Sequence, residues 1–480
     1  KRVVAFDMDM IEELGFYKFD VLALDTIFII REALLSIEKY TGEMIDLHSI
    51  DYNDKNVYDM LCNGDVSGIF QLANQSEKVM QQKPRNFRDL IAINALIRPG
   101  VGDWNEYLSR REGKEYTIIP EREPYMRETE GLLTYQEQFL LDAAVFAGWG
   151  IAYSDKNIRK NKNIKEDYAL RDKFFNDSLN NGFNKEVIVE VWNNICDAVD
   201  GGYSFNKSHS ACYAMTSYQT AWLKYYYPKH YYAALMSAEG SDKHGQAKIA
   251  EYVAECKQKG IKILPPNINN SSDKFEVQEE GINYRITAIK HVGDSAISHI
   301  KKLQPIESFD DFLERAEKRY ARVNVVTNLI KAGCFDFDEP NRALLLEKLK
   351  VSRMTKKELS EYKEQDIVFN DALRAKWEKE VLGLYLSKHP MEKYGFHPLD
   401  SFKNKSECLQ GGEVVEVSVV RDKNNNEMAF SSIDTLFGIV KIVIFNSVWK
   451  NENVQKSMQE GNIVMIKGCR DGNNVLLNSV

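Results

Sequence analysis

The stretch between residues 201 and 228 constrains the fold of this chain most, because a loop passes there directly into a long predicted helix. Two glycines open the loop, and the chain is predicted to turn helical from Ala211 on, where small and aromatic residues continue to a proline that ends the helix. Three adjacent polar residues stand at the helix start: Lys207, Ser208 and His209. They could bind a phosphate, since helix N-termini offer unpaired N–H groups and a positive dipole. A buried amphipathic helix with Lys and His at its solvated end explains the local chemistry equally well.

The bulk composition indicates a soluble protein of several domains. The 480 residues allow several domains at ~100–200 residues each, and 44% apolar with 28% charged residues is typical of globular proteins. The seven cysteines are scattered without a CxxC pair, which indicates a reducing compartment and no disulfide framework or zinc ribbon. No apolar run reaches the ~20 residues of a membrane span. The net charge of −8 does not indicate a nucleic-acid binder, so local basic patches matter more.

Residues 205–228, FNKSHSACYAMTSYQTAWLKYYYP, closely resemble a long signature of the α subunits of bacterial replicative DNA polymerase III, the family C polymerases. Three further segments resemble this family in the same order along the chain: GDVSGIFQL at 64–72, ALIRPG at 95–100 and GLLTYQEQ at 131–138. The resemblance covers nearly the whole chain. The N-terminus has no initiator Met and resembles the middle of a domain, which predicts a fragment or one part of a split polymerase.

The resemblance implies a multidomain α+β fold with four parts. Residues 1–40 would end a nucleotidyltransferase-type palm, and residues 41–235 would form mostly helical fingers. Residues 236–395 would form a clamp-binding domain with a helix-hairpin-helix at about 284–335, followed by an OB-fold β-barrel at 396–480. For this last part the residues themselves agree, since short alternating segments separated by turns, at 413–420, 428–435, 438–445 and 464–468, predict the strands of a small barrel.

Asp20 is the candidate catalytic residue and metal ligand. It lies in an apolar run that predicts a buried strand, where a carboxylate is costly unless it is paired or bound to a metal. A helix N-cap or a salt-bridged core acid is the structural alternative. Residues 18–24, KFDVLAL, resemble the family's palm strand, which implies that Asp20 is the third metal-binding carboxylate. Lys18, on the same strand face, would reach the triphosphate.

A second pair of acids, Asp7 and Asp9, has the spacing of a metal site on a strand. We reject it, because its segment resembles one that merely precedes the third carboxylate in the family. The other two carboxylates that hold Mg²⁺ in the family would therefore lie upstream of this chain.

Residues 155–165 hold five basic residues in eleven, a pattern that a solvated helix face also explains. The family's matching segment contacts the nucleotide triphosphate and the primer–template backbone. This implies that Arg159 binds the nucleotide and that Lys160 and Lys162 bind DNA. The family's own lysines are replaced here, and Lys160, Lys162 and Lys165 are all candidates for their role.

The resemblance assigns further phosphate contacts to two loops of the predicted fingers. Lys207, Ser208 and His209 would bind the triphosphate. Arg98, left at a loop edge by a Pro-Gly turn, would bind DNA.

The segment from Tyr284 to Gly293, followed by a predicted helix at 294–302, predicts the helix-hairpin-helix. Gly293 can adopt a positive φ there and expose N–H groups to a DNA phosphate, with Lys290 as a neighbouring DNA contact. Such contacts would be independent of DNA sequence.

Gln365, Val368 and Phe369 fit a short pattern that docks on the sliding clamp in the family, with apolar anchors beside one polar group. A helical turn that packs two apolar residues is the structural alternative. The pattern precedes residues 377–390, WEKEVLGLYLSKHP, which resemble a segment at the same place in the family and whose His-Pro end is interpreted as structural.

The predicted barrel carries three aromatic residues that could stack on single-stranded DNA: Phe430, Phe445 and Trp449. Few basic residues accompany them, so binding of single strands stays open.

Taken together, the resemblance predicts a DNA-directed DNA polymerase that adds dNTPs to a primer 3′-hydroxyl by the two-metal mechanism with Mg²⁺. Its partners would be primer–template DNA, dNTP and the sliding clamp, with the N-terminal polymerase half as a further candidate, since this chain alone is expected to be inactive. The expected location is the cytoplasm of a bacterium or of a phage host. A non-catalytic scaffold that binds DNA and clamp, and a nucleotidyltransferase acting on RNA or small molecules, are the alternatives.

Overall fold

The computed structural model describes residues 6–7, 10–11, 14–16, 24–73, 75–96, 104–161, 163–200, 205–240, 242–270, 272–362 and 369–480. They form two compact units, one of residues 43–228 and one that joins residues 1–42 to 229–480. Each unit is considered by itself. None of the helices in this part of the chain is long and apolar enough to cross a membrane.

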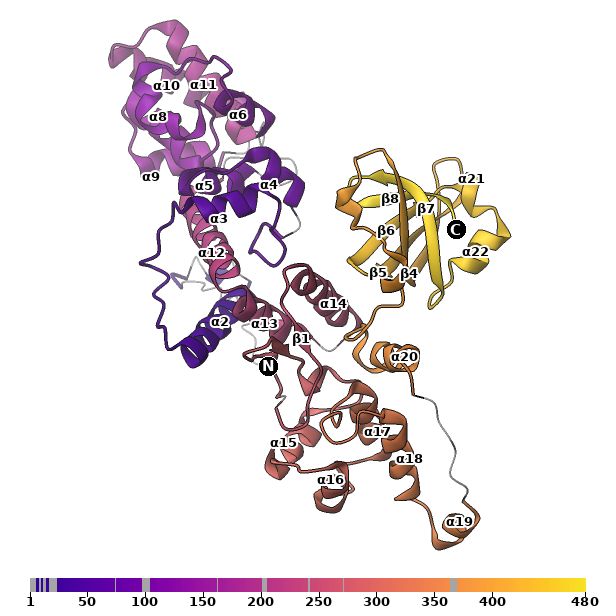
Figure 1. Ribbon diagram of the computed structural model, residues 1–480. Helices are drawn as coiled ribbons and strands as arrows, with labels where there is room; N and C mark the ends of the chain where they lie inside the picture. The colour runs from indigo at the N-terminus through magenta and orange to yellow at the C-terminus, as the bar shows by residue number, and fades with distance from the viewer. Residues whose placement is uncertain are drawn as a thin grey trace. The chain divides into compact units, whose positions relative to one another are not determined.

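In the unit 43–228, three short helices surround one long helix, α12 (Lys207–Tyr226) (Figure 1). The three are α3 (Lys55–Cys62), α4 (Ser76–Gln82) and α5 (Phe87–Leu96). Small residues on α12 let its neighbours approach, and Ala214, Tyr218 and Ala221 are fully buried in a core shared with all three. The first half of the unit is thereby built around the helix that the sequence singled out.

The other half of the same unit is a second helical core. The helices of this half are α6 (Trp104–Arg111), α7 (Glu123–Met126), α8 (Gln136–Ala147), α9 (Ile151–Ser154), α10 (Tyr168–Asn180) and α11 (Lys185–Asp200). Of these, α6 contributes Tyr107 to a separate small cluster with α5. Helices α8, α10 and α11 pack on one another around Phe146, Phe174 and Trp192. A parallel bridge between Tyr135 and Phe205 connects the segment before α8 to the segment before α12. This bridge positions the start of α12 against the start of α8.

The other unit contains a small sheet with the strand order β1-β3-β2 and helices that precede and follow it along the chain. The strands are β1 (Ile263–Leu264), β2 (Glu276–Val277) and β3 (Ile282–Asn283). The helices are α2 (Asp25–Thr41), α13 (Pro228–Ala238), α14 (Lys243–Gln258), α15 (Asp294–Leu303), α16 (Phe309–Arg315), α17 (Val323–Ala332), α18 (Arg342–Val351), α19 (Lys356–Glu361) and α20 (Asp371–Leu382). Helix α17 packs against both α18 and α20.

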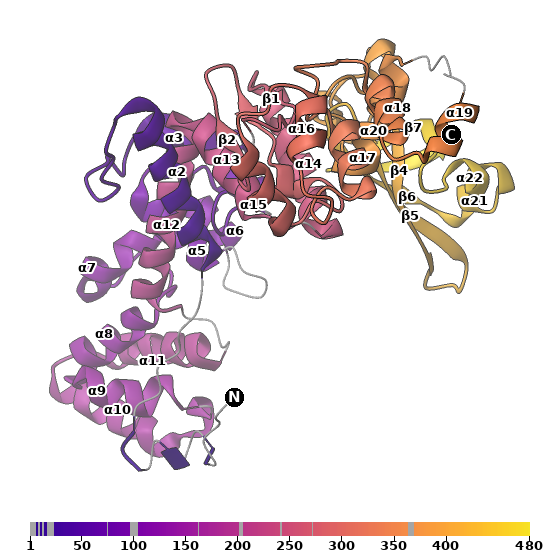
Figure 2. The ribbon, with the colours of Figure 1, turned by 90° about the horizontal axis from the view of Figure 1, so that it is seen from below.

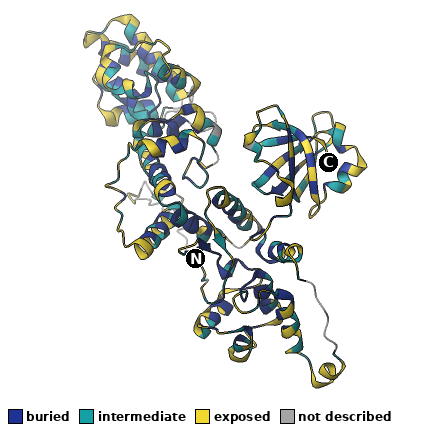
Figure 3. Ribbon diagram, in the orientation of Figure 1, coloured by how far each residue is buried: buried dark blue, intermediate teal, exposed yellow. Residues whose placement is uncertain are grey.

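A closed five-stranded barrel ends the chain, with the strand order β4-β5-β6-β8-β7. Its strands are β4 (Glu407–Arg421), β5 (Glu427–Thr435), β6 (Gly438–Ile444), β7 (Ile463–Asp471) and β8 (Asn474–Ser479). Buried and exposed residues alternate along β7, as expected for a strand with one face in a core (Figure 3). Two short helices, α21 (Asn446–Trp449) and α22 (Glu452–Ser457), lie together beside the barrel (Figure 2).

Gly412 shows why the long strand β4 needs a glycine in its middle. A Cβ at this position would lie 2.3 Å from the carbonyl oxygen of Asp434 on the neighbouring strand β5. Because that oxygen belongs to the backbone, no larger residue can be accommodated without moving the strand. The glycine thus permits the close approach of β4 and β5.

The predicted multidomain α+β architecture, with a mostly helical middle part and a C-terminal β-barrel, is confirmed. The predicted boundaries at residues 40, 235 and 395 stay predictions. The predicted palm strand around Asp20 lies outside the described residues.

Candidate functional site

The first turn of α12 carries the three adjacent polar residues of the sequence signature. Asn206 caps the helix, since its side-chain oxygen accepts hydrogen bonds from the His209 amide at 2.8 Å and from the Ser208 hydroxyl at 2.6 Å. Asn is a preferred N-cap residue because it satisfies helix amides that lack a partner. The helix consequently begins at Lys207, four residues before the predicted start, and holds Lys207, Ser208 and His209 in one turn.

Lys207 is bound by two acidic residues from other elements. Its ammonium donates to both carboxylate oxygens of Glu128, at 2.7 and 2.8 Å, and its backbone amide donates to the carboxylate of Glu137, at 2.9 and 3.1 Å. The ammonium also lies 5.8 Å from the centre of the Tyr135 ring. Two carboxylates therefore lie at the helix turn that is predicted to bind a phosphate.

His209 is exposed, and its ring lies between two aromatic side chains. The ring centres are 5.4 Å from Phe205 and 4.2 Å from Tyr213. These contacts orient the imidazole at the surface of the unit, where it could donate a hydrogen bond to a ligand. The neighbouring Ser210 is buried and donates to the Ile91 carbonyl oxygen at 2.7 Å, which anchors this turn to α5.

Arg159 ends a single π-helical turn, Asp155–Arg159, that follows α9 and packs against α8. Such turns are frequent at functional sites. The guanidinium binds Asp155 in the same turn, and the ammonium of Lys160 lies 3.7 Å from the same carboxylate. The hydrogen bond from Arg159 lowers the pKa of Asp155 below its usual value. Both predicted cations are therefore present, but each has an acidic partner.

Lys165 is the third candidate for the role of the family's own fingers lysines. Lys165 binds two acids of α11, Asp197 at 3.1 Å and Asp200 at 2.9 Å, so it contributes to the packing of its own unit. Lys162 lies outside the described residues, as do Lys18, Asp20 and Arg98.

The predicted helix-hairpin-helix turn differs from the expectation at Gly293. This glycine has φ of −97° and forms the N-cap of α15, whereas His291 two residues earlier has φ of +67°. The reason is that an N-cap residue requires extended backbone, so the left-handed residue of the turn must precede it. Gly293 and Lys290 are both exposed, and the Lys290 amide donates to the Val381 carbonyl of α20 at 2.9 Å.

Phe369 is the described residue of the predicted clamp-docking pattern, since Gln365 and Val368 lie outside the described residues. Its ring is partly buried and packs on Trp377 with ring centres 5.4 Å apart, while the Arg374 guanidinium lies 5.4 Å from its centre. The predicted aromatic anchor thus packs on α20.

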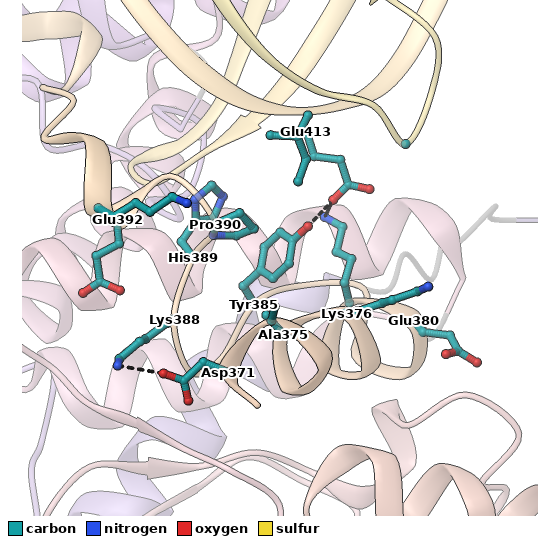
Figure 4. Close-up of a pocket in the computed structure, with 15 residues that line it drawn as sticks. Asp371, Ala375, Lys376, Glu380, Tyr385, Lys388, His389, Pro390, Glu392 and Glu413 are labelled. Carbon is teal, nitrogen blue, oxygen red and sulfur yellow. Dashed lines mark hydrogen bonds and ion pairs between the residues drawn. The ribbon is translucent and has the colours of Figure 1, made fainter. Parts of the chain in front are cut away.

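A pocket of about 870 Å³ lies between α20, the segment after it and the barrel (Figure 4). Its charged residues are largely paired: the Tyr385 hydroxyl donates to Glu413 at 2.5 Å, and Lys388 binds Asp371 at 2.9 Å. Burial lowers the pKa of His389 below its usual value, so it is neutral near pH 7. The pocket was not predicted, although residues 377–390 were recognised and His389 was interpreted as structural.

Two of the three aromatic residues that could stack on single-stranded DNA are exposed on the barrel. Phe430 and Phe445 are exposed, whereas Trp449 is buried in the barrel core and cannot stack on a base. A shallow pocket of about 330 Å³ includes Phe430 and Lys441. Within the described part of the chain, no three His, Cys, Asp or Glu residues gather in the manner of a metal site.

The sequence analysis missed the acids that hold Lys207. Glu128 lies 79 residues from Lys207 along the chain, and Glu137 lies 70 residues away. Glu137 belongs to the segment GLLTYQEQ that was recognised by resemblance, so its place in a motif was the one available signal. No local pattern marks Glu128.

Comparison with known proteins assigns two parts of the chain. Residues 26–182 match a family described as the bacterial DNA polymerase III alpha subunit finger domain, and residues 260–345 match a helix-hairpin-helix motif. The predictions of a fingers domain and of a helix-hairpin-helix are thereby confirmed.

Individual relatives extend the similarity to nearly the whole chain. The chain is 31% identical to the DNA polymerase III subunit alpha of Aquifex aeolicus, over 97% of its own length and 42% of the relative's. It is 30% identical to the proteins of the same description from Staphylococcus epidermidis and Thermus aquaticus, which it covers to 45% and 41%. The chain thus spans less than half the length of these curated relatives.

Proposed function

Because the chain belongs to the DNA polymerase III alpha subunit family, we propose that it supplies the fingers, the helix-hairpin-helix region and the C-terminal barrel of a template-directed DNA polymerase. The observation that carries the proposal is the first turn of α12. It combines a helix N-terminus with Lys207, Ser208 and His209, and it belongs to the signature that most resembles the family.

In the proposed reaction, the primer 3′-hydroxyl attacks the α-phosphate of a dNTP and pyrophosphate leaves. Phosphoryl transfer depends mainly on positioning and on neutralisation of charge. Lys207 and Arg159 would neutralise the triphosphate, while Ser208 and His209 would donate hydrogen bonds to it. Lys18 is a further candidate for this role.

Mg²⁺, when bound, would neutralise phosphate charge and activate the attacking hydroxyl. Asp20 is proposed as its ligand in this chain, together with two carboxylates of the upstream palm. This assignment rests on the resemblance of residues 18–24 to the palm strand of the family.

The remaining proposed contacts are with DNA and with the sliding clamp. The exposed turn with Lys290 and Gly293 would bind the DNA backbone without regard to sequence, as Arg98, Lys160 and Lys162 would in the fingers. Gln365, Val368 and Phe369 would dock on the sliding clamp, with Phe369 released from Trp377 to act as an anchor.

Primer extension with Asp20→Ala tests the proposal. The chain is assayed together with the palm segment that carries the other carboxylates, as one polypeptide and as two, with Mg²⁺ and dNTPs. We expect Asp20→Ala to lower the rate by roughly a thousandfold or more, and the matched control Asp7→Ala to leave it nearly unchanged.

Each other outcome decides against part of the proposal. Extension that survives Asp20→Ala would show the palm assignment to be wrong. Primer–template binding without any extension by the wild type would favour a non-catalytic scaffold.

A further inference from the structure

We propose that Glu128 is a built-in competitor of the nucleotide, which binds the Lys207 ammonium while the triphosphate is absent and releases it when the triphosphate binds. The inference rests on the proposed function of the α12 first turn and concerns the regulation of that site. Its starting point is the two-oxygen contact between Glu128 and the lysine ammonium, at 2.7 and 2.8 Å.

The Glu128 carboxylate presents to Lys207 the same chemistry as a phosphate. Two oxygens that share one negative charge accept from one ammonium, as two oxygens of a phosphate group would. Because a lysine ammonium is a compact point charge on a flexible stem, it can exchange one such partner for another. Lys207 cannot keep its full contact with Glu128 and also neutralise a triphosphate.

Exposure permits this exchange. The Lys207 side chain is 40% exposed and that of Glu128 is 25% exposed, so water reaches both partners. Solvated ion pairs of this kind are weak. A triphosphate carries several negative charges, so it is the stronger partner for the ammonium.

The second carboxylate of the site, Glu137, has a different role. It lies in the first turn of α8, where the Tyr135 amide donates to the Gln138 side-chain oxygen at 2.8 Å. Its partner is the backbone amide of Lys207, not the ammonium. Glu137 therefore positions the start of α12, and Glu128 is the carboxylate that binds the Lys207 ammonium.

Recapture of Lys207 by Glu128 also bears on the end of the reaction. Pyrophosphate binds through the same phosphate contacts as the triphosphate, and its departure restores the pair of Glu128 with Lys207. The competitor thereby lowers the affinity for product as well as for substrate.

Titration with inorganic tripolyphosphate, followed by calorimetry at low salt, tests the inference on the full chain. This probe carries the charge of the nucleotide without its base. We expect Glu128→Gln to tighten binding about two- to fivefold, the gain that corresponds to removing one partly solvated ion pair. Lys207→Met should weaken binding, and Glu128→Gln should give no gain in a Lys207→Met background.

Glu137→Gln is the matched control, because it removes the same charge from the second carboxylate beside Lys207 and its amide oxygen can still accept from the Lys207 N–H. A gain in Glu128→Gln no larger than that in Glu137→Gln would mean a general field effect and would overturn the inference. Loss of affinity in Glu128→Gln, or no detectable binding by wild type and Glu128→Gln alike, would overturn it too.

The proposed function fails in a distinguishable way. If Lys207→Met binds tripolyphosphate as well as the wild type, Lys207 is not a phosphate ligand, and the assignment of the α12 turn is wrong. If Lys207→Met weakens binding while Glu128→Gln leaves it unchanged, the site stands and only the competitor role of Glu128 is lost. Thermal unfolding of each variant confirms that it is folded.

Discussion

The two ends of α12 carry one lysine each, and the two lysines have opposite surroundings. Lys224, in the last turn, has a side chain that is 0% exposed, with its ammonium 2.6 Å from Asp65 and 2.8 Å from the Ser67 carbonyl oxygen. Lys207, in the first turn, is 40% exposed and bound to Glu128. Both belong to the same sequence signature, and each forms an ion pair with an acid distant in sequence.

The difference between the two lysines is the cost of separating each from its acid. A buried charge that loses its partner leaves an uncompensated charge out of water, whereas a solvated charge exchanges its partner for water or for another anion. Lys224 thus fixes the helix to the loop after α3, and Lys207 is able to bind a ligand. Burial, not residue type or motif membership, separates Lys224 from Lys207, the lysine that is proposed to bind the nucleotide.

Replacement of Lys224 is expected to have the largest effect on stability. Lys224→Met keeps much of the side-chain volume but leaves Asp65 and the Ser67 carbonyl without the ammonium. We expect a loss of about 3 kcal/mol in the free energy of unfolding, the lower end for a broken buried pair, because Asp65 is 27% exposed. Urea unfolding followed by circular dichroism measures it, and a loss below about 1 kcal/mol would contradict the structural role.

The same substitution in the first turn should separate stability from binding. Lys207→Met removes a partly solvated pair, so we expect a loss of less than about 1 kcal/mol in the free energy of unfolding. Affinity for the dNTP, measured on a primer that cannot be extended, should nevertheless fall by roughly tenfold, since a charged phosphate contact is lost. Destabilisation equal to that of Lys224→Met would remove the contrast between the two ends.

The sequence predicted the elements of this region better than their partners. The helix was recognised, but its start was placed at Ala211 because the capping role of Asn206 was not considered. The acids that select the role of each lysine, Glu128 and Asp65, are far away in sequence. Pairings over such separations depend on how the helices pack, and no local pattern encodes them.

The barrel gives the same lesson in a sheet. The predicted strands at 413–420, 428–435, 438–445 and 464–468 correspond to β4, β5, β6 and β7. Strand β8 was missed, because it is short and is defined by its pairing with β7 on one side and with β6 on the other.

Gly293 was assigned a positive φ from residue type alone, although its position as an N-cap requires extended backbone.

Tyr227 directly follows α12, at the same end of the helix as the buried Lys224. Its exposed contact is expected to contribute little to the free energy of unfolding. Its hydroxyl donates to Glu43, and this hydrogen bond, with a smaller contribution from burial, raises the pKa of Tyr227 to about 12 from its ordinary value of 10.0. Above pH 10 the unfolded chain loses this proton while the folded chain keeps it, so stability is lost as the pH rises from 10 to 12.

Tyr227→Phe removes this titration, so the variant should lose less stability than the wild type between pH 10 and 12. Because the contact is partly solvated, we expect the difference to stay below about 1 kcal/mol. Urea unfolding of both proteins across this range measures it, with Tyr225→Phe, an exposed neighbour, as the control. A difference as large as the effect of Lys224→Met would mean that position at the end of α12, and not burial, sets the strength of its contacts.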